Sequence, residues 1–158
     1  MRDFLQRRLA EPLLALLKQG VTPGRLAASV ALGIVIGLIP ILGVSTALCA
    51  LAALALRLNM PAIQLVNDLI TPLQLVLIIP LLRFGEQLTR APRFPITLEA
   101  GLALLSHGVV HAVTVLATAI MHATLGWGVL APLVGYALYR ILEPVFRRLT
   151  PISAAAAR

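Results

Sequence analysis

Between Leu26 and Leu56 the chain reads LAASVALGIVIGLIPILGVSTALCALAALAL, and the architecture expected of the protein follows from this stretch. Its 31 residues include no charged side chain, whereas about 20 apolar residues are enough for one membrane span. Pro40 and Gly43 lie near its midpoint and are expected to interrupt the helix. Each arm would then be about 22 Å long, too short to cross a hydrocarbon core of about 30 Å. The stretch therefore predicts a re-entrant hairpin, which enters and leaves the membrane on the same side.

A second apolar segment has the same layout. It begins after Arg57, is interrupted at residues 67–74 by NDLITPLQ, and continues through Leu75–Leu82 to Arg83. Consecutive helices that are interrupted at corresponding places are typical of transporters. The segment therefore predicts a second broken, re-entrant helical hairpin.

The remaining chain divides at its polar residues. Residues 83–99 carry five charges and two prolines, which predicts an exposed loop. Residues 100–139 contain no Lys, Arg, Asp or Glu and are long enough for two transmembrane helices, with the turn between them at Gly126-Trp127-Gly128. The sequence thus predicts an all-α integral membrane protein with two re-entrant hairpins and a transmembrane helix pair.

The two ends of the chain lie outside this predicted membrane domain of residues 20–150. Leucines on one face and charges on the other predict an amphipathic interfacial helix at residues 1–19. Gly20 is expected to end it, with Thr22 capping the next helix and Pro23 in its first position. The Ser/Ala-rich tail at residues 151–158 is predicted to be disordered.

Composition and charge support a membrane location. Of the residues, 59% are hydrophobic and only 12% are charged, with 13 Lys and Arg against 6 Asp and Glu. Cytoplasmic flanks retain Lys and Arg, and two re-entrant hairpins would place nearly all of the basic residues on one side. The predicted location is the bacterial inner membrane, multi-pass, with both termini cytoplasmic. No basic run is interleaved with aromatic residues, so nucleic-acid binding is not expected.

Asp68 is the one carboxylate inside an apolar segment, and Gln64, Asn67 and Thr71 share its helical face. An ionisable group at membrane depth usually faces a wet cavity or a partner. Two interpretations remain open for this face. It is either a cavity wall with Asp68 as proton carrier or cation site, or an inter-helix hydrogen-bond seam in which Asp68 caps the break beside Pro72.

Further polar residues flank the two breaks. Ser45 and Thr46 follow the first break, where they could bind a polar ligand or cap the helix. Arg57 could attract an anionic headgroup or extend to the cytoplasmic interface, and Asn59 has an ordinary turn or capping explanation. The candidate substrate-binding residues are Ser45, Thr46, Arg57, Asn59, Gln64, Asn67, Asp68, Thr71 and Gln74.

The sequence contains little that indicates a catalytic site or a metal-binding site. A single intramembrane acid offers no carboxylate pair for acid–base catalysis, and no phosphate-binding glycine loop occurs. Cys49 has no partner cysteine and reads as a packing residue. The stripe of His107, His111 and His122 has no accompanying carboxylate ligand and reads as a helix-facing polar stripe. We therefore expect neither an enzyme nor a cofactor or metal.

The ordered set of breaks resembles the bacterial membrane family catalogued as domain of unknown function 2062. The similarity covers residues 20–150. Many relatives carry Asn-Pro where this chain has Asn67-Asp68, and some are fused to glycosyltransferase domains, which implies work on the envelope or on lipid-linked sugars. The matching motifs are Thr22-Pro23, Gly33-x3-Gly37-x2-Pro40-x2-Gly43, Arg57-x-Asn59-x-Pro61, Asn67-x4-Pro72-x-Gln74 and Gly85-Glu86.

Two hypotheses for function follow. The first is a small transporter or lipid-carrier translocase whose partners are the bilayer and an anionic lipid or polyprenyl phosphate. The alternative is a non-transporting membrane module that anchors or docks an envelope-synthesis enzyme. Re-entrant tips need neighbours to cover their backbone, so a homo-oligomer is also expected.

Overall fold

The computed structural model describes residues 21–41, 43–97 and 108–155, with single positions at 99, 103 and 106. Four helices make up the regular structure of this part of the chain, and it contains no strand. The all-α expectation is therefore confirmed for the described residues. The amphipathic helix expected at residues 1–19 lies outside them. The helices are α3 (Pro23–Gly37), α4 (Val44–Ala55), α5 (Met60–Thr89) and α7 (Val109–Ala155).

Helices α3 and α4 form the helix–break–helix unit expected at Pro40 and Gly43. Thr22 occupies the N-cap position of α3 and Pro23 is its first residue, as predicted, but the Thr22 side chain makes no capping hydrogen bond. Gly43 precedes α4 with φ of 83°, a left-handed conformation that glycine adopts without steric cost. The arms of 15 and 12 residues are about 22 and 18 Å long, so neither could cross a membrane alone.

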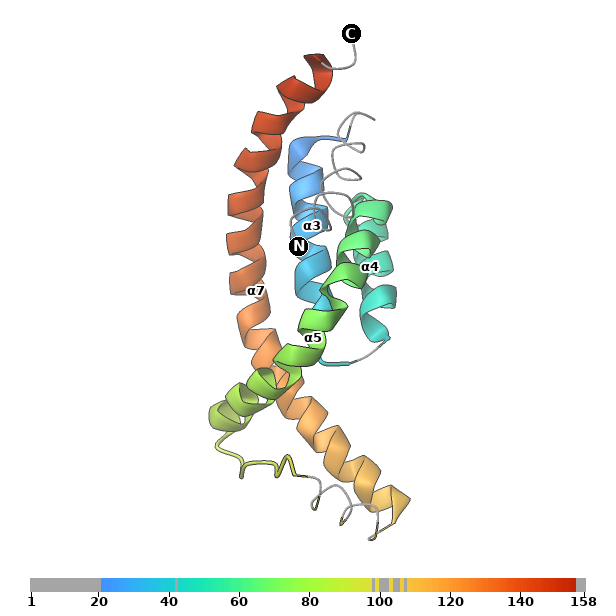
Figure 1. The fold of residues 1–158 in the computed structure, drawn as a ribbon, viewed down its shortest axis with the longest axis vertical. Helices are drawn as coiled ribbons and strands as arrows, with labels where there is room; N and C mark the ends of the chain where they lie inside the picture. The colour runs from blue at the N-terminus through green and yellow to red at the C-terminus, as the bar shows by residue number, and fades with distance from the viewer. Residues whose placement is uncertain are drawn as a thin grey trace.

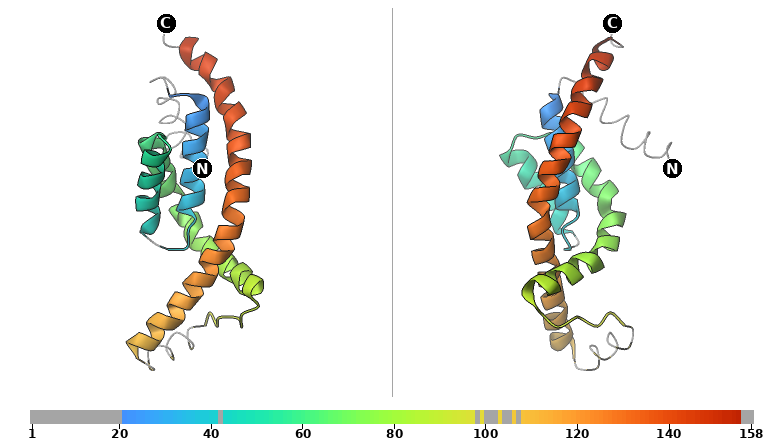
Figure 2. Two further views of the ribbon diagram at one scale, coloured as in Figure 1. Left: turned by 180° about the vertical axis from the view of Figure 1, so that it is seen from behind. Right: turned by 90° about the vertical axis from the view of Figure 1, so that its left-hand side faces the viewer.

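The second predicted hairpin is wrong. Helix α5 runs without interruption for 30 residues and contains Pro72 and Pro80 inside it. A proline within a helix removes one backbone hydrogen bond and bends the helix rather than necessarily ending it, and α5 is visibly curved (Figures 1 and 2). The helix also continues to Thr89, so residues 83–89 are not part of the loop expected at 83–99.

The predicted turn at Gly126-Trp127-Gly128 is also wrong. Helix α7 extends over 47 residues and passes through this triplet. Along the length of the molecule it crosses α5 and then packs beside α3 (Figure 1). The helix also takes in residues 151–155, the beginning of the predicted tail, while 156–158 lie outside the described residues.

Helix α3 lies at the centre, where it contacts α4, α5 and α7. Ser29, Gly33 and Gly37 lie on the packing face of α3, since all three are buried. A Cβ on Gly33 would come within 2.8 Å of the Ile63 carbonyl oxygen, and one on Gly37 would overlap the side chain of Ile70. The small residues thus allow α3 and α5 to approach closely.

The buried apolar residues form three clusters between the helices. One joins α3 to α5 and α7 around Leu26 and Phe146. Another holds Cys49 against α5, in the packing role expected for it. The last, around Leu82 and Ala123, lies where α5 crosses α7.

Two of the helices, at Met60–Thr89 and Val109–Leu149, are long and apolar enough to cross a membrane. Arg57 precedes α5 and Arg83 lies near its other end. Because α5 does not turn back at Pro72, these two arginines cannot lie at the same end of the bundle. Without the second hairpin, the expectation that nearly all basic residues share one side loses its basis for Arg83, Arg90 and Arg93.

Candidate functional site

Part of the predicted polar set lies between α4 and α5. Gln64 donates from Nε2 to the Thr46 carbonyl oxygen (3.2 Å), and Asn67 donates from Nδ2 to the Thr46 hydroxyl (3.4 Å). Asn67 and Ser45 are buried. The Oε1 of Gln64 and the Oδ1 of Asn67 are buried without a protein donor. These contacts match the interpretation of the face as an inter-helix hydrogen-bond seam.

Asp68 and Thr71 do not join this seam. Both are exposed, and the Thr71 hydroxyl donates to the Asn67 carbonyl of its own helix (3.2 Å). Of the candidate binding residues near the first break and on α5, the structure therefore brings Thr46 to Asn67 but leaves the Asp68 carboxylate outside. Because no break occurs at Pro72, the capping role suggested for Asp68 is wrong.

Gln74 connects the first break to α5. Its side chain is buried, and Nε2 donates to the Ile39 carbonyl oxygen at 2.6 Å. Ile39 lies in the segment between α3 and α4, where carbonyl groups lack helical partners. The Ile41 N–H donates to the same oxygen at 2.7 Å, so Gln74 adds a second hydrogen bond to this backbone acceptor and joins the hairpin to α5.

Asn59 has the capping role that the sequence allowed. Its Oδ1 accepts from the Ala62 backbone N–H (2.9 Å) at the start of α5, and its own N–H donates to the Ser29 hydroxyl (3.0 Å). Arg57 is exposed and takes a left-handed conformation with φ of 52° at the end of α4. The structure places these two residues at the α4–α5 turn, away from the Asn67 seam.

We expect Asn59→Ala to destabilise the fold by about 1 kcal/mol, because the first turn of α5 loses its side-chain acceptor. The measurement is the midpoint of thermal denaturation of the purified protein in detergent. Asn59→Asp, which keeps an acceptor oxygen, serves as the matched control and should remain near the wild type. An equal loss in both variants would contradict the capping role.

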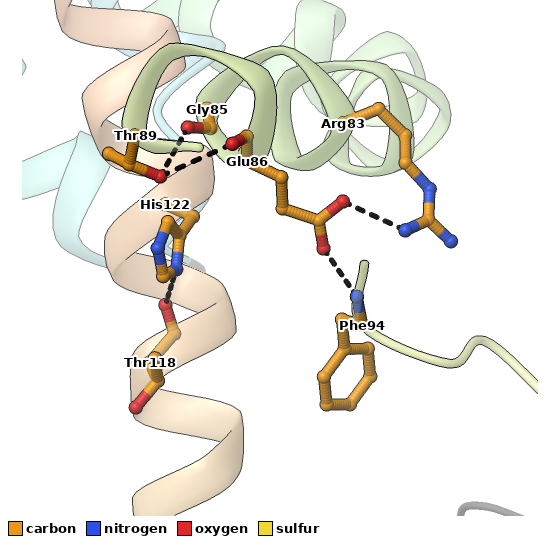
Figure 3. Close-up of polar contacts among 7 residues, drawn as sticks. All are labelled: Arg83, Gly85, Glu86, Thr89, Phe94, Thr118 and His122. Carbon is orange, nitrogen blue, oxygen red and sulfur yellow. Dashed lines mark hydrogen bonds and ion pairs between the residues drawn. The ribbon is translucent and has the colours of Figure 1, made fainter. Parts of the chain in front are cut away.

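A second polar site, which the sequence interpretation missed, lies where α5 crosses α7. Glu86 is only 3% exposed. Its Oε2 pairs with Arg83 Nη1 at 2.8 Å, and its Oε1 accepts from the Phe94 backbone N–H at 2.7 Å. Figure 3 shows the carboxylate between these two partners. The ion pair therefore fastens the segment after α5 to the helix.

His122 of α7 lies beside this ion pair (Figure 3). Its Nδ1 is 2.7 Å from the Thr118 carbonyl oxygen. A carbonyl only accepts hydrogen bonds, so Nδ1 carries the proton and Nε2 is the remaining ring nitrogen. Of the predicted polar stripe, His122 is half-buried and His111 is exposed, whereas His107 lies outside the described residues. The helix-facing interpretation therefore fits His122 and is wrong for His111.

The crossing itself depends on two glycines. A Cβ on Gly85 would overlap the backbone carbonyl of His122, and one on Gly126 would lie 2.5 Å from the Leu81 carbonyl oxygen. The two backbones are thus in direct contact. Gly126 therefore has a physical role, close helix approach, that differs from the turn predicted for it.

Two adjoining pockets flank the crossing, and together we name them the crossing cleft. One pocket, about 290 Å³, has a mostly apolar lining but includes the polar side chains of Glu86, Arg93, Thr118 and His122, and we call it the polar half. The apolar half, about 200 Å³, is lined by residues such as Pro40, Ile79, Leu116 and Ile120. Phe94 and Ala119 line both halves. Both halves are thus mainly apolar, and the polar half differs in having ionisable side chains among its lining residues.

A third pocket, of about 360 Å³, is apolar and lies between α3, α5 and α7. Trp127 lines it, and its indole N–H donates to the Val35 carbonyl oxygen at 2.9 Å, which fixes the ring. Sequence reasoning placed Trp127 at a membrane interface turn. The structure instead places it within the helix bundle.

The buried position of Glu86 had one signal in the sequence. Leu81, Leu82 and Gly85 precede it at helical spacing, so that Glu86 falls four residues after Leu82 on the same face. Arg83 lies three residues before Glu86, which is the spacing of an ion pair along a helix. If residues 81–86 had been predicted as helical, Glu86 would have been placed on the same face as buried leucines.

Comparison with known proteins gives one match. The family model described as "Uncharacterized protein conserved in bacteria (DUF2062)" matches residues 6–152. No curated protein and no solved structure matches significantly. The matched range includes all of the seam and the crossing cleft. The chain therefore belongs to this conserved bacterial family, as the ordered sequence motifs indicated.

Proposed function

We propose that this chain is a small multi-pass protein of the bacterial inner membrane that binds a lipid in the crossing cleft and moves it between the leaflets. The crossing cleft carries the proposal. A pocket that includes ionisable side chains and a wholly apolar pocket share Phe94 and Ala119 in their linings, between two helices long enough to span a membrane. A lipid has this same division between a polar head and an apolar tail.

Exposure of the long helices supports their contact with lipid. The most apolar windows of α5 and α7 are only 28% and 17% buried, whereas the core helix of a soluble protein would be mostly buried. Large apolar side chains such as Val76, Leu116 and Leu133 are at least half exposed. Lipid tails would cover these surfaces at no cost in apolar exposure.

Charge distribution supports an orientation. The start of α3 and the end of α7 lie at the same end of the bundle (Figure 1). The described residues near that end include five arginines and one acid, Glu143, whereas those near the other end include three arginines and two acids. The positive-inside bias therefore favours a cytoplasmic location for the first end, with α3 and α4 as a re-entrant hairpin entering from it.

Features of α5 are suited to a moving element. Pro72 and Pro80 each remove a helical hydrogen bond, so that the helix is more easily bent at these points. Where α5 contacts α7, Gly85 and Gly126 have no side chains that could interlock and hold the two helices in one position. Small sliding of packed helices is one recognised mode of conformational change.

The proposal is tested by reconstituting the full chain into phospholipid vesicles. The experiment follows the movement of a fluorescent phospholipid, and separately of a polyprenyl phosphate, to the outer leaflet. Ala119→Trp, which fills the junction of the two pockets, is expected to reduce the protein-dependent rate at least about tenfold, since the indole would occupy the space of the ligand. Leu133→Trp places the same side chain on the exposed face of α7 and should keep the rate. Vesicles with wild-type protein that move neither lipid faster than protein-free vesicles would reject translocation.

The rival function is a non-transporting module that docks an envelope-synthesis enzyme. The exposed apolar face of α7, which includes Val109, Val110 and Val113, favours it, because such a face also fits a partner helix. The variants discriminate between the two functions. Docking predicts that substitutions on this face change complex formation while Ala119→Trp has no effect.

A further inference from the structure

We infer that the polar half of the crossing cleft binds the phosphate of an anionic lipid and that Arg93 is the residue that recognises it. This inference deepens the proposed function by naming a ligand class for its site. It starts from the hydrogen-bonding groups that line the pocket. Some of these groups are already used within the protein, and others remain available to a ligand.

Each oxygen of the acid in the pocket already accepts a hydrogen bond. One oxygen of Glu86 accepts from Arg83 and the other from the Phe94 backbone. The carboxylate is therefore neutralised by its own neighbours and offers little repulsion to an incoming anion. The Thr118 hydroxyl is also used, because it donates to the Thr114 carbonyl (2.9 Å).

The groups that remain are suited to an anion. Arg93 lines the pocket and is exposed, and within the described part of the chain its guanidinium forms no hydrogen bond or ion pair. His122 keeps Nε2 after Nδ1 has bonded Thr118. A guanidinium presents parallel donors that match phosphate oxygens, and Nε2 can bond a protonated phosphate oxygen or, when protonated itself, donate to one.

The charge around the site and the second pocket indicate which class of ligand fits. Arg83, Arg90 and Arg93 outnumber Glu86 and Glu99 around this end of α5, so the local field favours an anion. Beyond Phe94 the cleft continues between apolar side chains. A free phosphate would leave that half empty, whereas a phosphate with an attached hydrocarbon chain fills both halves.

The test is a binding titration of the purified full chain in detergent, without any transport step. Three probes are compared: a short-chain fluorescent phosphatidic acid, a phosphatidylcholine with the same chains, and inorganic phosphate as competitor. We expect phosphatidic acid to bind at least about tenfold more tightly than phosphatidylcholine, as one charge-assisted hydrogen bond implies. Inorganic phosphate should not displace it at comparable concentration. Equal binding of the two lipids would overturn headgroup recognition, and inorganic phosphate competing as well as phosphatidic acid would overturn the lipid assignment.

The variants locate the effect. Arg93→Gln is expected to weaken phosphatidic acid binding about tenfold and to leave phosphatidylcholine binding unchanged. Arg90→Gln removes the same charge three residues away, outside the residues that line the pocket, and should change little. Equal losses in the two variants would show that only the general field matters and would overturn the role of Arg93. Headgroup-selective binding without translocation would reject the proposed function alone, whereas translocation without headgroup selectivity would reject this inference alone.

Discussion

Gly85→Ala is expected to destabilise the folded protein by about 3 kcal/mol, the upper part of the range for an overpacked contact. The new Cβ would overlap the backbone carbonyl of His122, and a backbone cannot move aside as the end of a flexible side chain can. For a chain of this size the loss corresponds to a fall of roughly 10 °C in the thermal midpoint. Scanning fluorimetry in detergent would measure it.

Gly128→Ala is the matched control for this prediction. It adds the same methyl group to α7, but no atom lies within 4 Å of the new Cβ. Because alanine has a helix propensity about 1 kcal/mol better than glycine, this variant should be as stable as the wild type or more so. If both alanine variants behaved alike, the close crossing of α5 and α7 would be contradicted.

Glu86→Leu is expected to cost about 2–3 kcal/mol, because it leaves Arg83 without its partner and the Phe94 N–H without an acceptor. The figure is below that of a fully buried pair, because the Arg83 side chain is 32% exposed and water screens part of the interaction. The thermal midpoint measures the loss. Limited trypsin digestion provides a second readout, since cleavage after Arg93 should accelerate when the segment is no longer fastened.

Two comparisons test the origin of this loss. Glu143 pairs with Arg147, whose side chain is 70% exposed, and Glu143→Leu should therefore cost no more than about 1 kcal/mol. The double variant Arg83→Leu/Glu86→Leu removes both charges and should be more stable than Glu86→Leu alone. A double variant as unstable as the single one would show that the uncompensated arginine is not the cause.

The two predicted helix breaks had different outcomes for a physical reason. At the first, Pro40 is followed by Gly43, which adopts a left-handed conformation, and together they reverse the chain. At the second, Pro72 acts without a glycine, and α5 absorbs the missing hydrogen bond by bending. Packing along α3 and the bond from Gln74 to Ile39 hold the continuous helix in place.

The candidate site was foreseen only in part. Helical spacing correctly placed Gln64 and Asn67 on one face, and both contact Thr46. The same spacing could not show that the Asp68 side chain is exposed, since a helix is covered only where a neighbour packs on it. The five charged residues at 83–99 led to the prediction of an exposed loop, although α5 continues to Thr89. The number of charges in a segment does not show that one carboxylate, Glu86, is paired with Arg83 and buried near α7, which is distant in sequence.

By itself, the sequence determined the apolar helical character of the chain, the break between α3 and α4, and the family to which it belongs. These properties depend on residue type and short-range spacing, which are visible along the chain. Only the tertiary structure decided that α5 and α7 are single long helices and that Glu86 and His122 lie together at their crossing. Both results depend on long-range contacts. Glycine has the same appearance in a sequence whether it permits a turn, as at Gly43, or close helix packing, as at Gly126, and only the neighbouring backbone distinguishes the two.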